Sequence, residues 1–470
     1  MLLRHHLVHE HFFLFIVFCA AFFVRSLLFY CFVGHGQNCS VYFDSAQYQE
    51  VAQGITSGKG ICKADGSPNF YRVPGYPIFL SFFMQGCKDV NTSLWVQIFL
   101  SSFIPLLLFC LALILFPGHV PFAKGVAVCG IFHLGFVLYS GMIATESLFV
   151  LFFLLFLIAF LPNLKFFRWL DVEPQDHGYH DEDVSRMFFA GLMLGVASLI
   201  RPVGHFILFI ALLMILAAVG SAWHKIKSGG LLLGGWVTIV AWWLLRNYIL
   251  TGALFFHTLP GLHFLQYGAT KVVMEVKDCS YVEARGALMA KWSKTIEHES
   301  QAKGRPLNEY ERCVVAEGIA LRYFFKRPVM VIKHCFLEVM KTCLGLYSAQ
   351  MVFSDGEQWS PYTTEANWKA RIEKYLCPHV KTWYLVPLVR VEIAYSLLLF
   401  IGFLGFILWG IFYYRHWQLA LLKTMPFILL LIGVTCAYGC ARLRLPVEPF
   451  LLIFGLYFWS HLPFIMRDSQ

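Results

Sequence analysis

Residues 41–80 contain the side chains of this sequence that are best placed to do chemistry. They form the first long polar stretch, and they follow an apolar N-terminal run. The stretch carries an isolated acid, Asp44, and an arginine, Arg72, just ahead of the turn-forming residues 74–77. A carboxylate accepts a proton from an attacking hydroxyl, and a guanidinium stabilises an anionic leaving group. The pair therefore suits a transfer reaction at a membrane surface.

Both residues also have a simpler interpretation. Asp44, Tyr48 and Ala52 are spaced by four, which predicts a short amphipathic helix with the acid in its first turn. An acid at that position is commonly an N-cap. Arg72 has the alternative role of a lipid-headgroup anchor. The pattern alone does not decide between these roles.

Other ionisable residues stand at the ends of apolar runs. Glu146 begins one run, where it is either a favourable partner of the helix dipole or a second acid facing Asp44. A single arginine at a membrane boundary is usually an anchor, but several on one side favour an anion site, because arginine binds phosphate in forked geometry. The predicted external ends carry four: Arg201, Arg246, Arg442 and Arg444.

The composition indicates a membrane protein. The chain has 470 residues, of which 58% are hydrophobic and 14% charged, and its mean hydropathy is +0.64. Soluble proteins carry about 25% charged residues, so this chain has too little charge for a soluble domain. The net charge of +9 suits a membrane surface or a phosphate-bearing substrate without choosing between them. No segment resembles a nucleic-acid-binding module.

The apolar runs predict an all-α polytopic membrane protein, because backbone groups in lipid must be bonded within each segment. With the N-terminus inside, two long loops fall on the same external side. Lysines and arginines in the short internal loops agree with this orientation. We expect ten transmembrane helices, over residues 11–33, 93–116, 122–139, 144–161, 187–200, 203–219, 231–245, 383–413, 419–440 and 447–464.

The same pattern predicts three parts. Residues 1–245 form an N-terminal membrane module with a catalytic first external loop, 34–92. Residues 246–382 form an external loop domain, and 383–470 contribute the C-terminal transmembrane helices. Within the loop domain, polar residues recur at helical spacing from His334 to Gly345. This spacing favours a helix that lies in the membrane interface.

The cysteines and histidines show no metal-binding motif. None of the 14 cysteines forms a CxxC pair, and the histidines lack ligand spacing. His133 stands alone on an apolar helix, which is typical of a core residue. The sequence leaves the use of a divalent metal open and contains no ligand cluster that demands one. Cys39, Cys62 and Cys87 share the first external loop, where an oxidising compartment would permit a disulfide of unknown pairing.

Six short segments together resemble a known superfamily. In order along the chain they read FDSAQYQEVAQGI, YRVPGYPIFL, ATESLF, LIRP, LLRNYILTG and ARLRLPVEP. Their order and placement resemble the GT-C superfamily of integral membrane glycosyltransferases. The nearest branch is that of the bacterial relatives of dolichyl-phosphate-mannose protein mannosyltransferases and of the aminoarabinose transferases of lipid A. The resemblance runs from Arg25 to about Pro449, whereas residues 255–382 match no family.

The resemblance implies roles for individual residues. Asp44 corresponds to the catalytic acid of the first loop and would be the general base. Glu146 corresponds to a second acidic position that orients acceptor or donor. Arg72 and Arg246 stand where the family keeps basic residues for the carrier phosphate. The other expected substrate-binding residues are Tyr48, Tyr76, Arg201, Arg442 and Arg444, of which one of the last two closes the phosphate pocket.

These roles imply an inverting glycosyltransferase that uses a polyprenyl-phosphate sugar donor at the external, periplasmic face of a bacterial inner membrane. Because the leaving group is a weakly basic phosphate, a general acid is less needed than in glycoside hydrolysis. The acceptor is a lipid, a glycan or a protein. Ser45 follows Asp44 where the protein mannosyltransferases have a second acid, which leaves the acceptor open.

Two other classes of protein also combine many spans with polar loops. One is a ligase or polymerase of lipid-linked polysaccharide, which would use a diphosphate carrier. The other is a transporter or flippase, but transporters usually place polar groups near mid-membrane and often contain inverted repeats. In this sequence the ionisable residues gather at one boundary. The sequence names neither the sugar nor the carrier length nor the oligomeric state.

Overall fold

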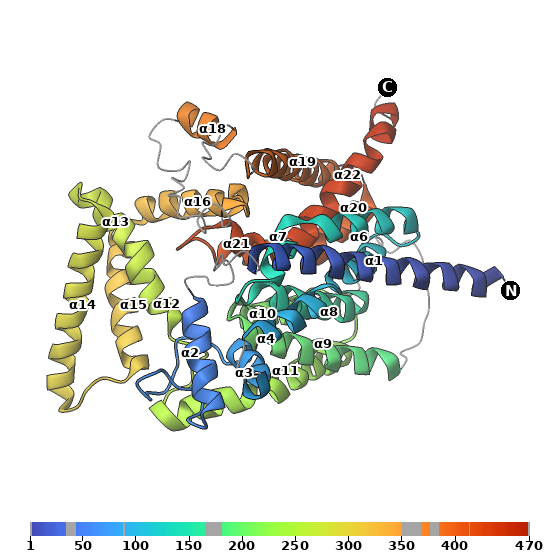
Figure 1. The fold of residues 1–470 in the computed structure, drawn as a ribbon. Helices are drawn as coiled ribbons and strands as arrows, with labels where there is room; N and C mark the ends of the chain where they lie inside the picture. Colours follow the sequence, from blue (N-terminus) through green and yellow to red (C-terminus); the bar gives the residue numbers. More distant parts are fainter. Residues whose placement is uncertain are drawn as a thin grey trace.

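The structure is a computed structural model that describes residues 2–33, 44–87, 90–164, 181–349, 368–376, 385–412 and 414–468. Within these ranges the chain forms helices joined by turns, with one isolated β-bridge between Cys62 and Pro68. The all-α fold class is therefore confirmed (Figure 1). Cys62 is a free, buried thiol. Cys39 lies outside the described residues, as does the side chain of Cys87, so a bridge between these two stays a prediction.

The helices of the N-terminal half are α1 (Leu2–Val33), α2 (Ser45–Thr56), α3 (Gly75–Cys87), α4 (Val90–Ser101), α5 (Ile104–Leu115), α6 (Val120–Phe132), α7 (Leu134–Ser140), α8 (Glu146–Phe160), η1 (Leu161–Asn163), α9 (Asp181–Ile200), α10 (Val203–Ala217) and α11 (Ala222–Thr251). Those of the C-terminal half are α12 (Leu259–His263), η2 (Phe264–Ala269), α13 (Thr270–Lys277), α14 (Tyr281–Lys303), α15 (Glu309–Lys326), α16 (Pro328–Leu344), α18 (Trp368–Leu376), α19 (Leu385–Phe412), α20 (Arg415–Gly433), α21 (Ala441–Arg444) and α22 (Glu448–Asp468).

The predicted count of ten transmembrane helices is not confirmed. Among the described residues, six stretches are long and apolar enough to cross a membrane, and a bent pair makes up to seven. A membrane span needs about 20 residues, whereas α10 and the apolar parts of α3 and α9 are shorter. The six stretches are Glu10–Cys31, Val90–Leu115, Glu146–Asn163, Ala222–Thr251, Leu385–Phe412 and His416–Gly433.

The structure also differs in detail from three of the predicted segments. The span expected over residues 122–139 is two helices, α6 and α7, bent by 49° at His133. The His133 ring accepts a hydrogen bond from the Phe136 N–H and so caps α7. The first external loop contains an apolar helix, α3. Finally, α11 continues past the predicted end of its span, so Arg246 lies inside a helix.

Helix α8 lies at the centre of the main hydrophobic core. Its sequence is apolar all round, as expected for a helix buried on every side, and Phe149, Phe153 and Phe156 are fully buried. It packs against α9, which in turn packs closely on α11. A Cβ atom at Gly235 would lie 2.2 Å from the Phe188 carbonyl oxygen, so only glycine permits this approach. The buried core thus fixes Glu146 at the first turn of α8.

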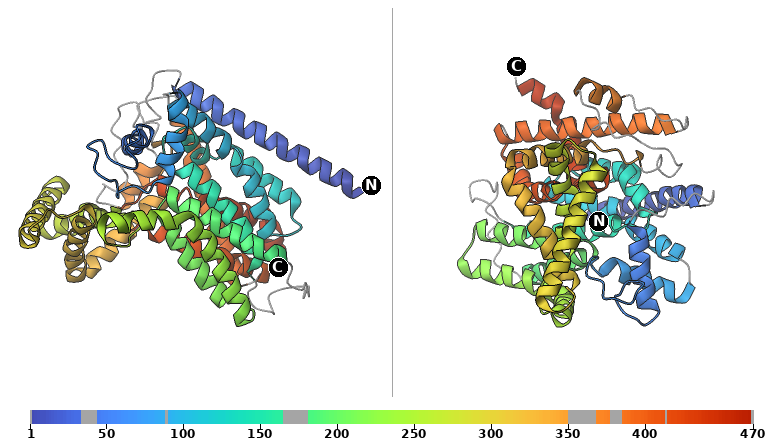
Figure 2. Two further views of the ribbon diagram at one scale, coloured as in Figure 1. Left: turned by 90° about the horizontal axis from the view of Figure 1, so that it is seen from below. Right: turned by 90° about the vertical axis from the view of Figure 1, so that its left-hand side faces the viewer.

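Residues 258–326 form a smaller core of their own. Buried apolar side chains of η2, α13, α14 and α15 pack together there, including Leu265, Leu288 and Ile319. Figure 1 shows α14 and α15 side by side at one edge of the molecule, and Figure 2 shows them projecting from the main bundle. The predicted interfacial helix corresponds to α16, whose relation to a membrane stays a prediction.

Candidate functional site

Five charged residues from five separate segments meet at one place. Asp44 precedes α2, Arg72 precedes α3, Glu146 begins α8, Arg201 joins α9 to α10, and Arg442 lies in α21. Arg72 Nη2 is paired with Asp44 Oδ1. Arg442 donates through Nη2 to Asp44 Oδ2 at 2.7 Å and through Nε to Glu146 Oε1 at 2.5 Å. Arg201 Nη1 is 3.2 Å from the same Glu146 oxygen. We call these five residues the Asp44 cluster.

Asp44 is held by arginines and does not cap its helix. Its backbone stands at the N-cap position of α2, but its side chain makes no capping hydrogen bond. The N-cap interpretation of the carboxylate is therefore wrong. Burial raises the pKa of the Asp44 carboxyl, but the charges of Arg442 and Arg72 outweigh it and leave the pKa below its usual value. Asp44 is thus a carboxylate at neutral pH, the form that accepts a proton.

The two acids of the cluster differ in their access to solvent. The Asp44 side chain is 25% exposed, whereas that of Glu146 is fully buried. One oxygen of Glu146, Oε2, has no hydrogen-bond partner. Three guanidiniums therefore contact two carboxylates, which leaves a net positive charge beside the exposed acid. A substrate reaches Asp44 before it reaches Glu146.

Arg72 is fixed by neighbours on several sides. Its Nε donates to Gln47 Oε1 at 2.8 Å. Its guanidinium carbon lies 5.2 Å from the centre of the Tyr48 ring and 5.0 Å from that of Tyr71. These distances are within the range of cation–π attraction. Tyr48 is itself buried, so its ring is a fixed surface against which the Arg72 guanidinium packs.

A buried glutamine ties the loop before Glu146 to the rest of the site. Gln97 Nε2 donates to the carbonyl oxygens of Met142 at 2.8 Å and Ser140 at 3.0 Å. Gln97 Oε1 accepts a hydrogen bond from the Tyr76 hydroxyl at 2.9 Å. Tyr76 is fully buried. The sequence predicted a substrate contact for Tyr76, but its side chain lies behind the site and positions Gln97.

Two further close approaches bring the segments of the cluster together. The Ser45 hydroxyl donates to the Ile143 carbonyl oxygen at 2.9 Å, which joins the start of α2 to the loop before α8. A Cβ atom at Gly75 would lie 2.6 Å from the Leu199 carbonyl oxygen. Glycine at this position therefore allows the start of α3 to pack on the end of α9. This contact brings the chain near Arg72 toward the chain near Arg201.

Sequence reasoning missed two histidines beside the cluster. His263 lies near enough for the charges of Arg72, Asp44 and Arg442 to act on it. Burial, reinforced by Arg72, lowers the pKa of His263 to about 4. The pKa of the neighbouring His257 falls to about 3, again mainly through burial. Both are neutral at neutral pH, and only the three-dimensional packing of α12 reveals them.

Aromatic residues pack next to His263 at the edge of the site. The Tyr267 ring is 5.1 Å from the His263 ring and 4.9 Å from the Tyr438 ring. Burial raises the pKa of Tyr71, beside Arg72, to about 12.

The described residues contain no group of three or more His, Cys, Asp and Glu side chains arranged to hold a metal ion.

Arg246 lies outside the Asp44 cluster. Its guanidinium donates to the carbonyl oxygens of Ile61 at 2.9 Å and Asn69 at 3.2 Å, and it lies over the Trp243 ring at 4.8 Å. The Asn69 side chain in turn donates to the Arg72 carbonyl oxygen at 2.8 Å. Arg246 therefore holds the loop that carries Arg72, and its link to the cluster is indirect.

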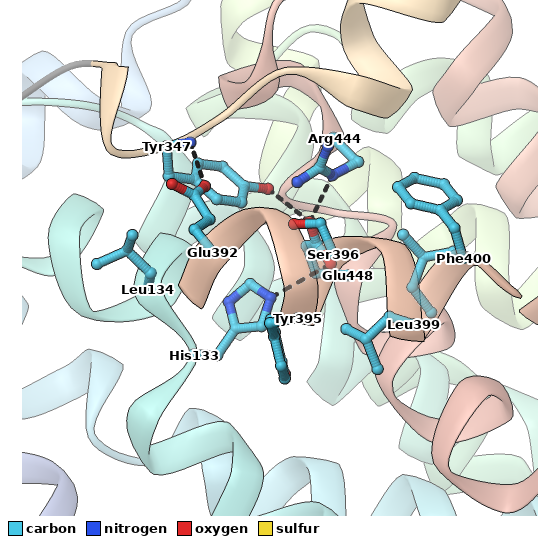
Figure 3. A pocket seen from close by; sticks show the side chains of 11 residues that line it. His133, Leu134, Tyr347, Glu392, Tyr395, Ser396, Leu399, Phe400, Arg444 and Glu448 are labelled. Atoms are coloured by element: carbon cyan, nitrogen blue, oxygen red, sulfur yellow. Dashed lines mark hydrogen bonds and ion pairs between the residues drawn. The ribbon is translucent and has the colours of Figure 1, made fainter. Parts of the chain in front are cut away.

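Arg444 also belongs elsewhere, in a second cluster formed with Glu448, His133, Tyr347 and Glu392. Arg444 Nε donates to Glu448 Oε1 at 2.6 Å, and the Tyr347 hydroxyl donates to the same oxygen at 2.8 Å. His133 Nε2 is 3.2 Å from Glu448 Oε2. Figure 3 shows Glu448 between these three partners in the pocket that they line. We call these five residues the Glu448 cluster.

Backbone contacts complete the Glu448 cluster. Glu392 accepts hydrogen bonds from the N–H groups of Tyr347 at 2.5 Å and Ser348 at 2.9 Å. Arg444 Nη1 donates to the Gly345 carbonyl oxygen at 3.0 Å. The Arg444 side chain is 2% exposed. Its guanidinium is therefore occupied within the protein, and Arg442 is the arginine of this pair that faces Asp44.

Comparisons with known proteins give one distant likeness. No family model matches the chain, and no curated protein matches it. Among solved structures, the chain is similar to the crystal structure of ArnT from Cupriavidus metallidurans in the apo state, with a TM-score of 0.33 and 10% sequence identity over 94% of this chain and 76% of that one. ArnT is an aminoarabinose transferase, a GT-C enzyme. A likeness this distant does not identify a function, so we argue the function from the side chains of the Asp44 cluster.

Proposed function

We propose that this protein is a membrane glycosyltransferase that moves a sugar from a polyprenyl-phosphate donor to a hydroxyl acceptor. The observation that carries the proposal is the position of the partly exposed Asp44 carboxylate between the guanidiniums of Arg72 and Arg442. Such a site offers a proton acceptor in direct contact with a pair of arginines that can bind an anion. These are the two functions that a single displacement at a sugar phosphate requires.

The arginines bind and stabilise the phosphate of the donor. Phosphate oxygens pair with guanidiniums in forked geometry and in short, charge-assisted hydrogen bonds. Arg72 and Arg442 are each anchored on the protein side, by Gln47 and by Glu146 respectively. They are thus held in place where negative charge grows as the bond to the sugar breaks. The excess of one positive charge in the cluster favours the anionic donor.

Asp44 accepts the proton of the acceptor hydroxyl as that oxygen attacks the sugar carbon. Attack from the face opposite the phosphate inverts the configuration at that carbon. In the free protein the two arginines keep the pKa of Asp44 low, which makes it a weak base. A donor phosphate competes for the same guanidiniums, so the pKa of Asp44 rises when the donor binds. The base therefore gains strength at the moment when it is needed.

Glu146 positions two arginines of the cluster from its buried side. Its buried carboxylate contacts Arg442 at 2.5 Å and Arg201 at 3.2 Å. It orients these arginines toward the exposed side of the site, and Gln97 keeps the preceding loop in place. We place the reaction at the external face of a bacterial inner membrane, where the carrier tail stays in lipid. The acceptor is a lipid, a glycan or a protein.

The direct test is transfer by the purified protein in lipid nanodiscs, with a polyprenyl-phosphate sugar and membrane lipids or glycans as acceptors. Asp44→Asn should reduce transfer at least about 1000-fold while donor binding is kept, because the amide cannot accept the proton. The matched control is Asp65→Asn, which removes an exposed acid from the same loop and should leave transfer unchanged. Full transfer by Asp44→Asn would refute the proposed base. A product formed only from a diphosphate carrier would favour a ligase or polymerase.

A further inference from the structure

Helix α16 packs tightly on the segment that leads from α20 into α21. Glu338 Oε2 accepts a hydrogen bond from the Gly439 N–H at 2.7 Å. A Cβ atom at Gly439 would lie 1.9 Å from the Glu338 carbonyl oxygen, and one at Gly345 would lie 2.7 Å from the Ala441 nitrogen. The two backbones therefore touch at two points, and glycine permits both contacts.

A lysine from a third element secures the same crossing. Lys271 of α13 donates to the Ala437 carbonyl oxygen at 3.0 Å and is 2.7 Å from Glu338 Oε1. Lys341 reaches that oxygen as well, at 2.7 Å. The contact between α16 and residues 436–441 is thus held by backbone, side chain and charge. Its register is fixed.

The register places two cysteines opposite each other. Cys335 lies one helical turn before Glu338, and Cys436 lies three residues before Gly439, within consecutive turns that extend α20. Cys335 and Glu338 are three residues apart and so lie on the same face of α16. Cys436 directly precedes Ala437, whose carbonyl oxygen is linked through Lys271 to Glu338. The two thiols lie close enough for each to act directly on the pKa of the other.

Both thiols are accessible and one is activated. Cys335 and Cys436 are half-buried, so a small oxidant reaches them. The neighbouring Cys335 thiol lowers the pKa of the Cys436 thiol to about 7. The thiolate is the form that attacks a disulfide. The same interaction raises the pKa of Cys335.

We propose that Cys335 and Cys436 form an oxidisable pair, a disulfide site that ties α16 to the segment carrying Arg442. The Cys436 thiolate attacks one sulfur of an external disulfide, and the other sulfur leaves as a thiolate. The Cys335 thiolate then attacks the Cys436 sulfur of this mixed disulfide and releases the second thiol of the oxidant. The pair loses two protons and two electrons, and the external disulfide gains them.

The bond would fasten the turn on which both arginine clusters depend. Arg442 follows Cys436 by six residues, and Arg444 already contacts the end of α16 through the Gly345 carbonyl oxygen. A link at Cys335 adds a covalent attachment near the other end of this contact. Oxidation should raise the thermal midpoint by about 5 °C, because the cross-link restricts the unfolded chain. This inference stands whether or not the protein transfers sugars.

The test is disulfide mapping on the full chain in detergent micelles. The protein is treated with oxidised glutathione, free thiols are blocked with N-ethylmaleimide, and digested peptides are identified by mass spectrometry. We expect a peptide pair joined through Cys335 and Cys436, present also in Cys343→Ser but absent from Cys335→Ser and Cys436→Ser. Cys343 is the matched control because it lies on the same helix and is also half-buried. The wild-type map is decisive even where a variant folds poorly.

Three results would overturn the inference. One is alkylation of both thiols by N-ethylmaleimide in a sample in which Cys279, a half-buried cysteine elsewhere, has formed a glutathione adduct. A second is a bond from Cys335 to Cys440 in place of Cys436. A third is an oxidised wild-type protein whose thermal midpoint equals that of Cys436→Ser, because the cross-link would then fasten nothing.

Discussion

Helix α21 is only four residues long, yet its two arginines enter two different clusters. Arg442 extends to Asp44 and Glu146, and Arg444 extends to Glu448. Both clusters join arginine to at least one buried acid, and both include a residue from α21. They differ in how completely their polar atoms are used. The comparison therefore separates a site that awaits a ligand from one that holds the fold together.

The Glu448 cluster is closed. Glu448 has partners on both carboxylate oxygens, and Glu392 is bonded to two backbone N–H groups. The Asp44 cluster is open, because Asp44 is partly exposed and Glu146 Oε2 has no hydrogen-bond partner. A closed cluster contributes mainly to stability. An open cluster with excess positive charge contributes to binding and chemistry.

The largest effect should come from breaking the closed cluster. Arg444→Met leaves the buried Glu448 carboxylate without its main counter-charge, and an uncompensated buried charge typically costs about 3–5 kcal/mol. We expect the free energy of unfolding in detergent to fall by about that amount. The control is Arg305→Met, because the Arg305–Glu311 pair is at the surface, where solvent screens an ion pair and leaves it little effect on stability. Equal stability of the two variants would remove the structural role of the Glu448 cluster.

Breaking the open cluster should affect transfer more than stability. Arg72→Met removes one phosphate-binding guanidinium, and the loss of one such donor typically lowers the rate about 100- to 1000-fold. Asp44 keeps its partner Arg442, so the thermal midpoint should change little. The matched variant is Lys63→Met. Lys63 is a cation of the same loop as Arg72, and it pairs with Glu309 of α15. Steady-state kinetics with varied donor check this, and unchanged donor kinetics in Arg72→Met would make Arg72 a purely structural residue.

Glu146→Gln should give a smaller loss. The amide keeps the shape of the side chain but loses the charge that holds Arg442 and Arg201. A misplacement of a catalytic group by about 1 Å costs about 100-fold in rate, and we expect a loss between 10- and 100-fold in transfer. Donor binding followed by fluorescence separates the two explanations. A variant that binds donor normally and yet transfers nothing would indicate that Glu146 takes part in proton transfer itself.

The pairing of Asp44, Arg72 and Glu146 could be anticipated from sequence because each stands in a short polar motif at the edge of an apolar run. The choice between Arg442 and Arg444 could not. Both lie at the same boundary, and which one faces Asp44 depends on how the short α21 packs against α16 and α22. Arg246 was expected to contact the phosphate because it too lies at a predicted membrane boundary. In the structure its guanidinium instead donates to the carbonyl oxygens of Ile61 and Asn69.

One predicted span is bent at a residue that also makes a tertiary contact. Residues 122–139 contain no proline, and they form one apolar run in the sequence. The break occurs at His133, whose ring caps α7 through the Phe136 N–H and also contacts Glu448. The Glu448 contact is not visible in a local pattern. His133 was expected to be a core residue, and its burial confirms that expectation.

The smallest expected effect is a shift in pH dependence, and it sharpens the comparison most. The pKa of Asp44 in the folded protein lies below its unfolded value of about 3.9. Its ionic contribution to stability is therefore complete above that value and is lost as the pH falls through the lower, folded pKa. The acid limb of kcat/KM, which reports the free enzyme, should accordingly lie below the ordinary aspartate range. In Arg72→Met one of the two charges that depress the pKa is gone, so this limb should move to higher pH. In Arg444→Met, measured at a temperature where the variant is folded, the limb should stay in place, because Arg444 contacts Glu448 and not Asp44. A limb that moves equally in both variants would mean that the two clusters titrate as one unit, and the division between an open and a closed cluster would fail.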